Sequence, residues 1–278
     1  MTHYSAILHP FTPDLGVSGF SVHWSTVIGI LALAGLYGWR ARVASARPTA
    51  GQIAAFSAGL LTLFFALNGP LHDLSDYYLF SVHMIQHLVL IFVVAPLLIA
   101  GTPGWMLRPA LALPGVGPVA RWVTKPAICF AAFNIAMIGW HLPPLYNLAM
   151  AEHPVHIVEH LMFLTVAVLM WWPFLSPLPE LPRLAYPGQM LYCFLMSIPM
   201  SIVAIYIAMA DHVLYPAYAA APRIWGLSPL EDQLFGGLVM WIPGGLVFAV
   251  VLSVVFFKWS SRGEDSTAAA QVDWRPAP

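Results

Sequence analysis

The chain has 278 residues, of which 60% are apolar and only 8% are charged, and its net charge is −1. A soluble domain carries about 25% charged residues, so this chain has too few charges to cover a surface that faces water. A mean hydropathy of +0.78 and long apolar runs indicate a polytopic protein of the lipid bilayer. The near-neutral charge gives no basic surface that would bind nucleic acid.

Seven apolar segments are long enough to cross a membrane as helices, so the predicted fold is all-α with seven transmembrane helices. In chain order they are Val22–Trp39, Ile53–Leu67, Val82–Ala100, Pro126–Trp140, His156–Trp172, Gln189–Met209 and Gln233–Phe257. Proline interrupts several of them, and membrane helices tolerate this because neighbouring groups satisfy the freed carbonyls.

The basic residues predict how these helices are oriented. Ten of the eleven fall on one side, and only Arg223 lies on the other. Those ten are Arg40, Arg42, Arg47, Arg108, Arg121, Lys125, Arg183, Lys258, Arg262 and Arg275. Because basic loops stay in the cytoplasm, we expect the N-terminus outside and the C-terminus in the cytoplasm. Residues 1–261 then form the seven-helix domain, and residues 262–278 form a disordered cytoplasmic tail.

All eleven histidines fall on the outer side of this topology, together with seven acidic residues. The histidines are His3, His9, His23, His72, His83, His87, His141, His153, His156, His160 and His212. The acidic residues are Asp73, Asp76, Glu152, Glu159, Asp211, Glu231 and Asp232. Ionisable residues near membrane spans are costly and mark functional sites, so we expect an imidazole-rich site on this side.

Two pairs of histidines share one spacing. His83 and His87 begin the third segment, and His156 and His160 begin the fifth. At i and i+4, both rings of a pair leave one helix face about 6 Å apart along the axis, where they can chelate a metal ion. One pair supplies only two ligands, whereas copper or zinc takes three or four. We therefore expect the two pairs to converge.

Four more residues complete the predicted site. Gln86 and Glu159 each follow the first histidine of a pair by three residues, where they can bind the metal or orient a ring nitrogen. His141, which closes the fourth segment, and His72, which follows the second, are the next candidate ligands. A single histidine at the end of a membrane helix can equally serve as an interfacial anchor or a cap.

Ligand type alone leaves three functions open, because imidazole suits zinc, copper, iron and nickel. The first is a factor that handles copper or inserts a cofactor. The second is a bis-histidine haem protein that transfers electrons. The third is a zinc-dependent membrane hydrolase, because His156-x-x-Glu159-His160 also matches the inverted zinc-peptidase pattern.

Three further features bear on structure. Ser228-Pro229-Leu230-Glu231 reads as a capping box, which gives Glu231 a structural role. Asp232-Gln233 follows directly and is compatible with either a structural or a functional role. Cys129 and Cys193 lie toward the cytoplasmic ends of their helices, so we expect them to pack in the core.

Motifs between residues 81 and 243 resemble, in consistent order, those of the CtaG family of bacterial cytochrome c oxidase assembly factors. They are Ser81-Val-His83-Met84-Ile-Gln86-His87, Ala95-Pro96, Gly101-Thr-Pro103, His141-Leu-Pro143-Pro144-Leu145-Tyr146, His156-Ile-Val-Glu159-His160, Trp171-Trp172-Pro173, Asp232-Gln233 and Gly237-Leu-Val-Met240-Trp241-Ile-Pro243. The resemblance implies a plasma-membrane protein that is needed to assemble haem–copper oxidase and helps copper reach it, without being an enzyme. An oxidase subunit or a periplasmic copper carrier is the implied partner.

Overall fold

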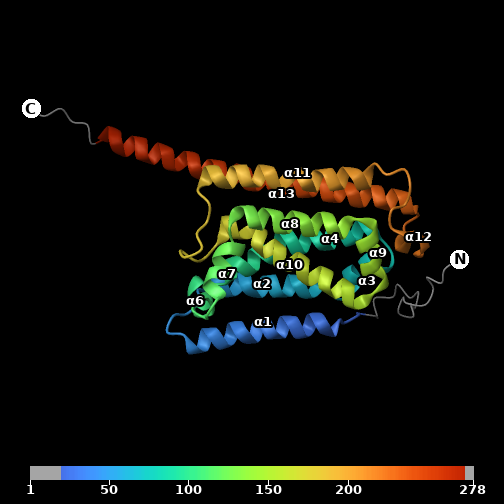
Figure 1. Ribbon diagram of the computed structural model, residues 1–278, viewed down its shortest axis with the longest axis horizontal. Coiled ribbons are helices and arrows are strands. Elements are labelled where there is room, and N and C mark those ends of the chain that lie inside the picture. Colours follow the sequence, from blue (N-terminus) through green and yellow to red (C-terminus); the bar gives the residue numbers. More distant parts are fainter. Residues whose placement is uncertain (1–19, 273–278) are drawn as a thin grey trace, which may run out of the picture.

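The computed structural model describes residues 20–272, with side chains described for residues 20–261. Every regular element in this part of the chain is helical (Figure 1). In chain order the elements are α1 (Trp24–Val43), α2 (Ala50–Ala66), α3 (Pro70–Tyr77), α4 (Phe80–Val89), the π-helical segment η1 (Leu90–Val94), α5 (Ala95–Gly101), α6 (Gly104–Leu111), α7 (Val116–Val123), α8 (Pro126–His141), α9 (Pro143–Ala151), α10 (His153–Leu175), α11 (Tyr186–Ala208), α12 (Pro216–Ala220) and α13 (Pro229–Val272).

Each of the seven predicted apolar segments lies in helix, apart from at most two residues at one end. They correspond to α1, α2, the continuous rod α4–η1–α5, α8, α10, α11 and α13. Among the described residues, four of these helices are long and apolar enough to cross a membrane, and six if α2 with α3 and α7 with α8 each form one bent span. The all-α membrane fold is therefore confirmed. A seventh span, which would be α1, stays a prediction.

The third segment is a rod with a π-helical turn placed just before Pro96. The Ala95 N–H donates to the Leu90 carbonyl, five residues back. In this register the Ile91 carbonyl faces the next residue, Pro96, which has no N–H to donate. The indole Nε1 of Trp171 on α10 donates to the Ile91 carbonyl instead, at 2.7 Å. Trp171 thus supplies the hydrogen bond that Pro96 cannot donate, and it holds α10 against the middle of the rod.

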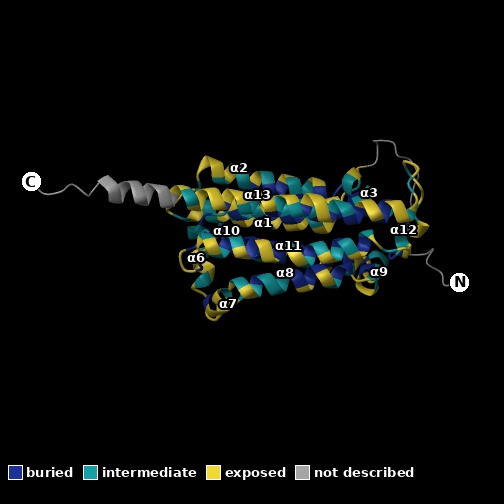
Figure 2. Cartoon of the chain, turned by 90° about the horizontal axis from the view of Figure 1, so that it is seen from above, coloured by how far each residue is buried: buried dark blue, intermediate teal, exposed yellow. Residues whose placement is uncertain are grey.

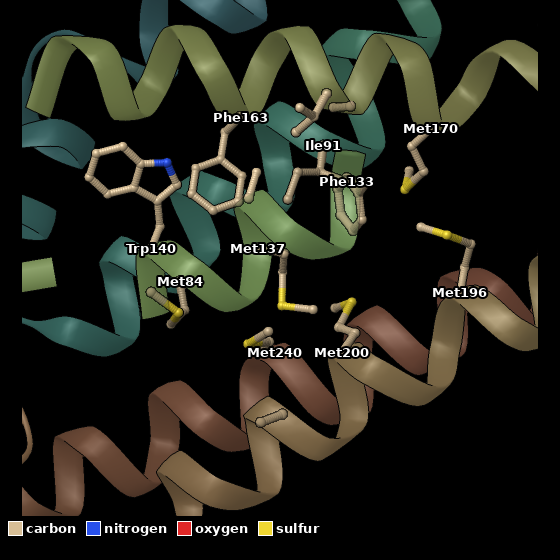
Figure 3. Packing of buried hydrophobic residues seen from close by; sticks show 14 of the residues in the cluster. Met84, Ile91, Phe133, Met137, Trp140, Phe163, Met170, Met196, Met200 and Met240 are labelled. Carbon is tan, nitrogen blue, oxygen red and sulfur yellow. The ribbon is translucent and has the colours of Figure 1, made fainter. Parts of the chain in front are cut away.

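The main core lies among the rod, α8, α10, α11 and α13, and methionines fill much of it. Figure 3 shows six of them pointing into the core from all five elements: Met84, Met137, Met170, Met196, Met200 and Met240. Unbranched thioether side chains fill the irregular gaps between helices. Cys129 and Cys193 are buried in the same core, and their thiols donate to backbone carbonyls at 3.3 and 3.1 Å. The prediction that they pack in the core is confirmed.

Small residues let α13 lie close against α11. A Cβ added at Gly237 would lie 2.8 Å from the Ala208 Cβ and 2.9 Å from the Ala204 carbonyl oxygen. Such close backbone approach stabilises helix pairs in membranes, where apolar burial alone gives little driving force. On the opposite faces of the two helices, large apolar side chains such as Ile202 and Leu246 are exposed, as expected for a surface that meets lipid (Figure 2).

The residues at the start of α13 also position other helices. The carboxylate of Asp232 accepts hydrogen bonds from the backbone N–H groups of Phe80 and Ser81 at 2.7 and 3.1 Å, so it caps α4 from another helix. Gln233 accepts a hydrogen bond from the Leu214 N–H at 2.7 Å. The Asp232 side chain thus holds the start of α4, where predicted ligands lie, and the Gln233 side chain holds the connection after α11.

The predicted capping box is present before α13. The Ser228 N–H donates to the Glu231 carboxylate at 2.8 Å, and the Glu231 N–H donates to the Ser228 hydroxyl at 3.2 Å. These two reciprocal bonds satisfy N–H groups that have no partner within the helix. The structural role expected for Glu231 is confirmed.

The two ends of the bundle differ in chemistry. The start of α1, with α3, α9 and α12, lies at one end, whereas α6 and α7 lie at the other with the end of α1 (Figure 1). Arg40 and Arg42 of α1, Arg108 of α6 and Arg121 of α7 therefore belong to the second end. The orientation of these ends relative to the cytoplasm stays a prediction.

The predicted tail, residues 262–278, begins inside α13. The backbone of this helix is described to Val272, and residues 273–278 lie outside the described part of the chain, as do His3 and His9. The boundary at residue 261 therefore stays a prediction.

Candidate metal centre

The predicted site residues come from four helices that meet at the α3 end of the bundle (Figure 1). The helix α3 carries His72, α4 carries His83, Gln86 and His87, α8 carries His141, and α10 carries His156, Glu159 and His160. All of them are buried except His160, which is partly buried. The structure therefore brings all eight candidates into one region.

The two i,i+4 pairs face each other. Within the pairs the ring centroids lie 4.3 Å apart for His83 and His87, and 4.4 Å apart for His156 and His160. Between the helices, the His83 ring lies 5.7 Å from that of His156, and the His87 ring lies 5.4 Å from that of His160. We call these four residues the histidine cluster. The expected convergence of the two pairs is thus present.

The nitrogens of the histidine cluster are buried and largely without hydrogen-bond partners. Both ring nitrogens of His83 and of His87 have no partner among the described residues, and neither do the Nε2 atoms of His156 and His160. Burying a polar atom without a partner costs about 1–3 kcal/mol. Buried nitrogens of this kind in a native fold indicate that a ligand binds there. A metal ion is such a ligand, because it accepts the lone pair of an imidazole nitrogen.

Two overlapping groups within this region have metal-ligand spacing. Donor atoms of His83, His156 and His160 lie within 4.8 Å of one another, and so do donor atoms of His83, His87 and Glu159. Two nitrogens bound to one ion at about 2.0–2.1 Å lie at most about 4.2 Å apart, so small side-chain rotations would complete either group. His83 belongs to both groups.

Gln86 orients His72 rather than a histidine of its own helix. Its amide nitrogen donates to the Ala66 carbonyl at 2.6 Å and contacts His72 Nδ1 at 2.8 Å. A carbonyl only accepts, so the Ala66 contact fixes which end of the amide is the nitrogen. His72 Nδ1 must then accept, and the ring carries its proton on Nε2.

Asp76 also lies in this region, although the sequence predicted only that it lies on the outer side of the membrane. Its carboxylate lies 3.3 Å from His72 Nε2, 3.4 Å from His156 Nδ1 and 3.9 Å from His83 Nδ1. One acid therefore contacts histidines from α3, α4 and α10. The available sequence signal is that His72 and Asp76 share the i,i+4 spacing of the two histidine pairs.

His141 lies beside the histidine cluster without joining either close group. Its ring is 6.5 Å from that of His87. Its Nδ1 lies 2.7 Å from the Met137 carbonyl oxygen, which only accepts, so Nδ1 carries the proton and Nε2 keeps its lone pair. His141 is therefore available as a further ligand.

Buried aromatic residues pack beside His83 on one side of the histidine cluster. The Tyr146 ring lies 5.5 Å from His83, and its hydroxyl lies 2.9 Å from that of Tyr218. Tyr218 in turn donates to the Ser75 carbonyl at 2.8 Å. The Tyr215 ring lies 4.1 Å from that of Tyr146. Tyr146 belongs to a motif quoted above, whereas Tyr215 and Tyr218 come from the connection after α11 and were missed.

Apolar helices surround buried imidazoles, and several ring nitrogens of these have no hydrogen-bond partner among the described residues. This arrangement defines a multi-pass, all-helical membrane protein with a candidate metal site. Residues 32–262 match the family model described as cytochrome c oxidase caa3 assembly factor (Caa3_CtaG). The chain belongs to this family, which confirms the resemblance found in the sequence.

Similar chains occur in mycobacteria. Proteins named as uncharacterized in Mycobacterium bovis and Mycobacterium tuberculosis are each 25% identical over 239 residues, which is 80% of this chain and 36% of theirs. A protein of Mycobacterium leprae, also named as uncharacterized, is 23% identical over 252 residues, or 85% of this chain and 38% of its own. The chain thus spans just over a third of the length of these relatives. No solved structure matches it.

Proposed function

We propose that the protein binds copper at the histidine cluster and passes it to cytochrome c oxidase while the oxidase is assembled. The observation that carries the proposal is the set of buried imidazole nitrogens without partners on two facing helices. Imidazole is a good ligand for copper, and the family supplies the destination, because its members are assembly factors for cytochrome c oxidase.

Transfer of copper by this site needs only ligand exchange. The two close groups share His83, so an ion held by His83, His156 and His160 can move toward His87 and Glu159 without leaving His83. No covalent bond forms or breaks in the protein, so the proposed function is not enzymatic. An exchangeable set of ligands suits a protein that must release its cargo as well as bind it.

The proposal places the histidine end of the bundle outside the bacterial plasma membrane. It includes seven spans, an outer N-terminus and a cytoplasmic C-terminus, which follow from the positions of the basic residues. The ion would then pass to an oxidase subunit, or come from a periplasmic copper carrier, on that outer side.

Metal analysis of the purified chain tests the proposal. Detergent-purified wild type is loaded with copper, passed through a desalting column, and measured for bound metal and for its visible spectrum. We expect bound copper, and we expect His83→Ala/His87→Ala to lose most of it. His212→Ala is the control, because His212 is exposed and paired with Asp211 at 2.7 Å.

Each alternative function gives a distinct result in the same experiment. A strong Soret band in protein purified from its host would identify a bis-histidine haem protein. Bound zinc with peptide hydrolysis would identify a hydrolase. Equal copper in the wild type and in a folded His83→Ala/His87→Ala variant, with folding checked by gel filtration, would show that the cluster is not the copper site.

A further inference from the structure

The histidine cluster continues toward the surface along one face of α10. His153, His156 and His160 stand at positions i, i+3 and i+7, so their side chains follow one stripe of the helix. His153 is exposed at the start of α10, whereas His156 is buried one turn further along. The stripe therefore joins the outer surface to the cluster.

A second histidine is held over the same region by the segment before α1. The Gly69 N–H donates to the Ser21 carbonyl at 2.9 Å, and the His23 N–H donates to the Asn68 side chain at 2.7 Å. Phe20 stacks on Phe64 with centroids 5.8 Å apart. These contacts fix residues 20–23 on the turn between α2 and α3.

This anchoring brings three imidazoles together outside the histidine cluster. The His23 ring stands edge-on to the His72 ring at 4.2 Å, and it lies 6.0 Å from the His153 ring. His72 in turn lies 6.1 Å from His156 and 6.0 Å from His160. The spacing between neighbouring rings is therefore 4–6 Å over the whole distance from the exposed His153 to the cluster.

We propose that His23, which lies beside the His72 ring, and His153, at the start of α10, form an outer imidazole site, where copper binds first and from which it passes to the histidine cluster. The inference rests on the proposed function and adds a second, shallower binding site to it. Asp76 lies between the two sites, in contact with His72 Nε2 and with His156 Nδ1 at 3.3 and 3.4 Å. Its carboxylate can hold the cation while the histidines exchange.

The outer imidazole site is partly separate from the region that defines the family. The match to the family model begins at residue 32, so His23 and the contacts of residues 20–23 lie before it. The cluster itself, from His83 to His160, lies entirely within the match. His23 thus lies outside the family match, whereas His153 lies within it.

Rates of copper loading test the outer site separately from the cluster. Copper(I) is offered to the 278-residue chain in detergent as its coloured bicinchoninate complex, and loss of colour gives the transfer rate and the equilibrium affinity. For His23→Phe/His153→Phe we expect a transfer rate at least ~10-fold lower, as for the loss of other groups that support a metal site. The equilibrium affinity should stay at the wild-type value, because the cluster is intact.

The control and the contrary outcomes are distinct. His212→Phe removes an exposed histidine that lies after α11 and is paired with Asp211, and it should load at the wild-type rate. A wild-type rate in His23→Phe/His153→Phe would overturn the outer site, and so would a matching loss of affinity, which would place these residues in the tight site. Failure of the wild type to take up copper would overturn the proposed function itself.

Discussion

The carboxylate of Asp76 contacts one histidine from each of α3, α4 and α10. Only 11% of this side chain is exposed, so water screens its charge incompletely. A fixed negative charge beside neutral imidazoles attracts a cation and also orients the rings that bind it. In the proposed copper site, Asp76 would therefore supply the negative charge beside a set of imidazole ligands.

We predict that Asp76→Asn lowers copper affinity by about 10–100-fold, the usual effect of losing a group that supports the ligands. The amide keeps the size of the side chain but loses its charge. Competition with a chelator of known affinity measures the change. Asp211→Asn is the control, because this acid is exposed and is paired with the exposed His212. Unchanged affinity in Asp76→Asn would remove the electrostatic role.

Glu159 adds a second carboxylate, one whose oxygen falls in the same close group as His83 and His87. We predict that Glu159→Gln also weakens copper binding by about 10–100-fold without abolishing it, because the imidazoles remain. In cells, oxidase activity lost in this variant should recover when copper is supplied in excess. Wild-type affinity would remove Glu159 from the site, and failure of added copper to restore activity would argue against copper supply as the function.

At the scale of the helix, the sequence predicted the features that depend on one helix alone. Both histidines of a pair sit on one helix, so the i,i+4 spacing places their rings on one face whatever the rest of the fold does. The apolar segments predicted the long helices for the same reason, because a span is defined by its own length and composition.

The remaining parts of the site depend on contacts between elements. Asp76 meets His83 and His156 because α3 follows α2 after a 45° bend, with Gly69 at a φ of +69°, and brings the Asp76 carboxylate to side chains of α4 and α10. Tyr215 and Tyr218 pack against Tyr146, which lies beside His83, and they come from a connection that has no apolar periodicity of its own. Spacing along one helix contains no information about such contacts, so the sequence could not predict them.

The π-helical turn of the rod gives a prediction at the element scale. Trp171→Phe removes the donor to the Ile91 carbonyl, and an unsatisfied buried acceptor costs about 1–3 kcal/mol. Trp140→Phe is a matched control. Both tryptophans belong to the same core and are 6% exposed, but Trp140 Nε1 has no hydrogen-bond partner among the described residues.

Titration with a denaturant in detergent measures the free energy of unfolding of each variant. Trp171→Phe should lose about 1–3 kcal/mol more than Trp140→Phe, since both changes remove a similar volume and only one removes a hydrogen bond. An equal loss in the two variants would show that the Ile91 carbonyl finds another partner.

For the whole molecule, the two ends of the bundle separate two kinds of chemistry. The candidate ligands gather with α3 at one end, and the basic residues of α1, α6 and α7 lie at the other (Figure 1). A copper site that serves an oxidase from outside the membrane requires the first end to face outward. The function and the topology are therefore coupled, and one experiment on topology tests both.

The last prediction is that the histidine end is outside the plasma membrane. Single cysteines are introduced by Ala220→Cys at the end of α12 and by Leu113→Cys between α6 and α7, both at exposed positions, and intact cells are treated with an impermeant maleimide. The native Cys129 and Cys193 are buried and give little background. Because basic loops stay in the cytoplasm, Ala220→Cys should react in intact cells and Leu113→Cys only after lysis. The reverse pattern would place the histidine cluster on the cytoplasmic side and exclude delivery of copper from outside.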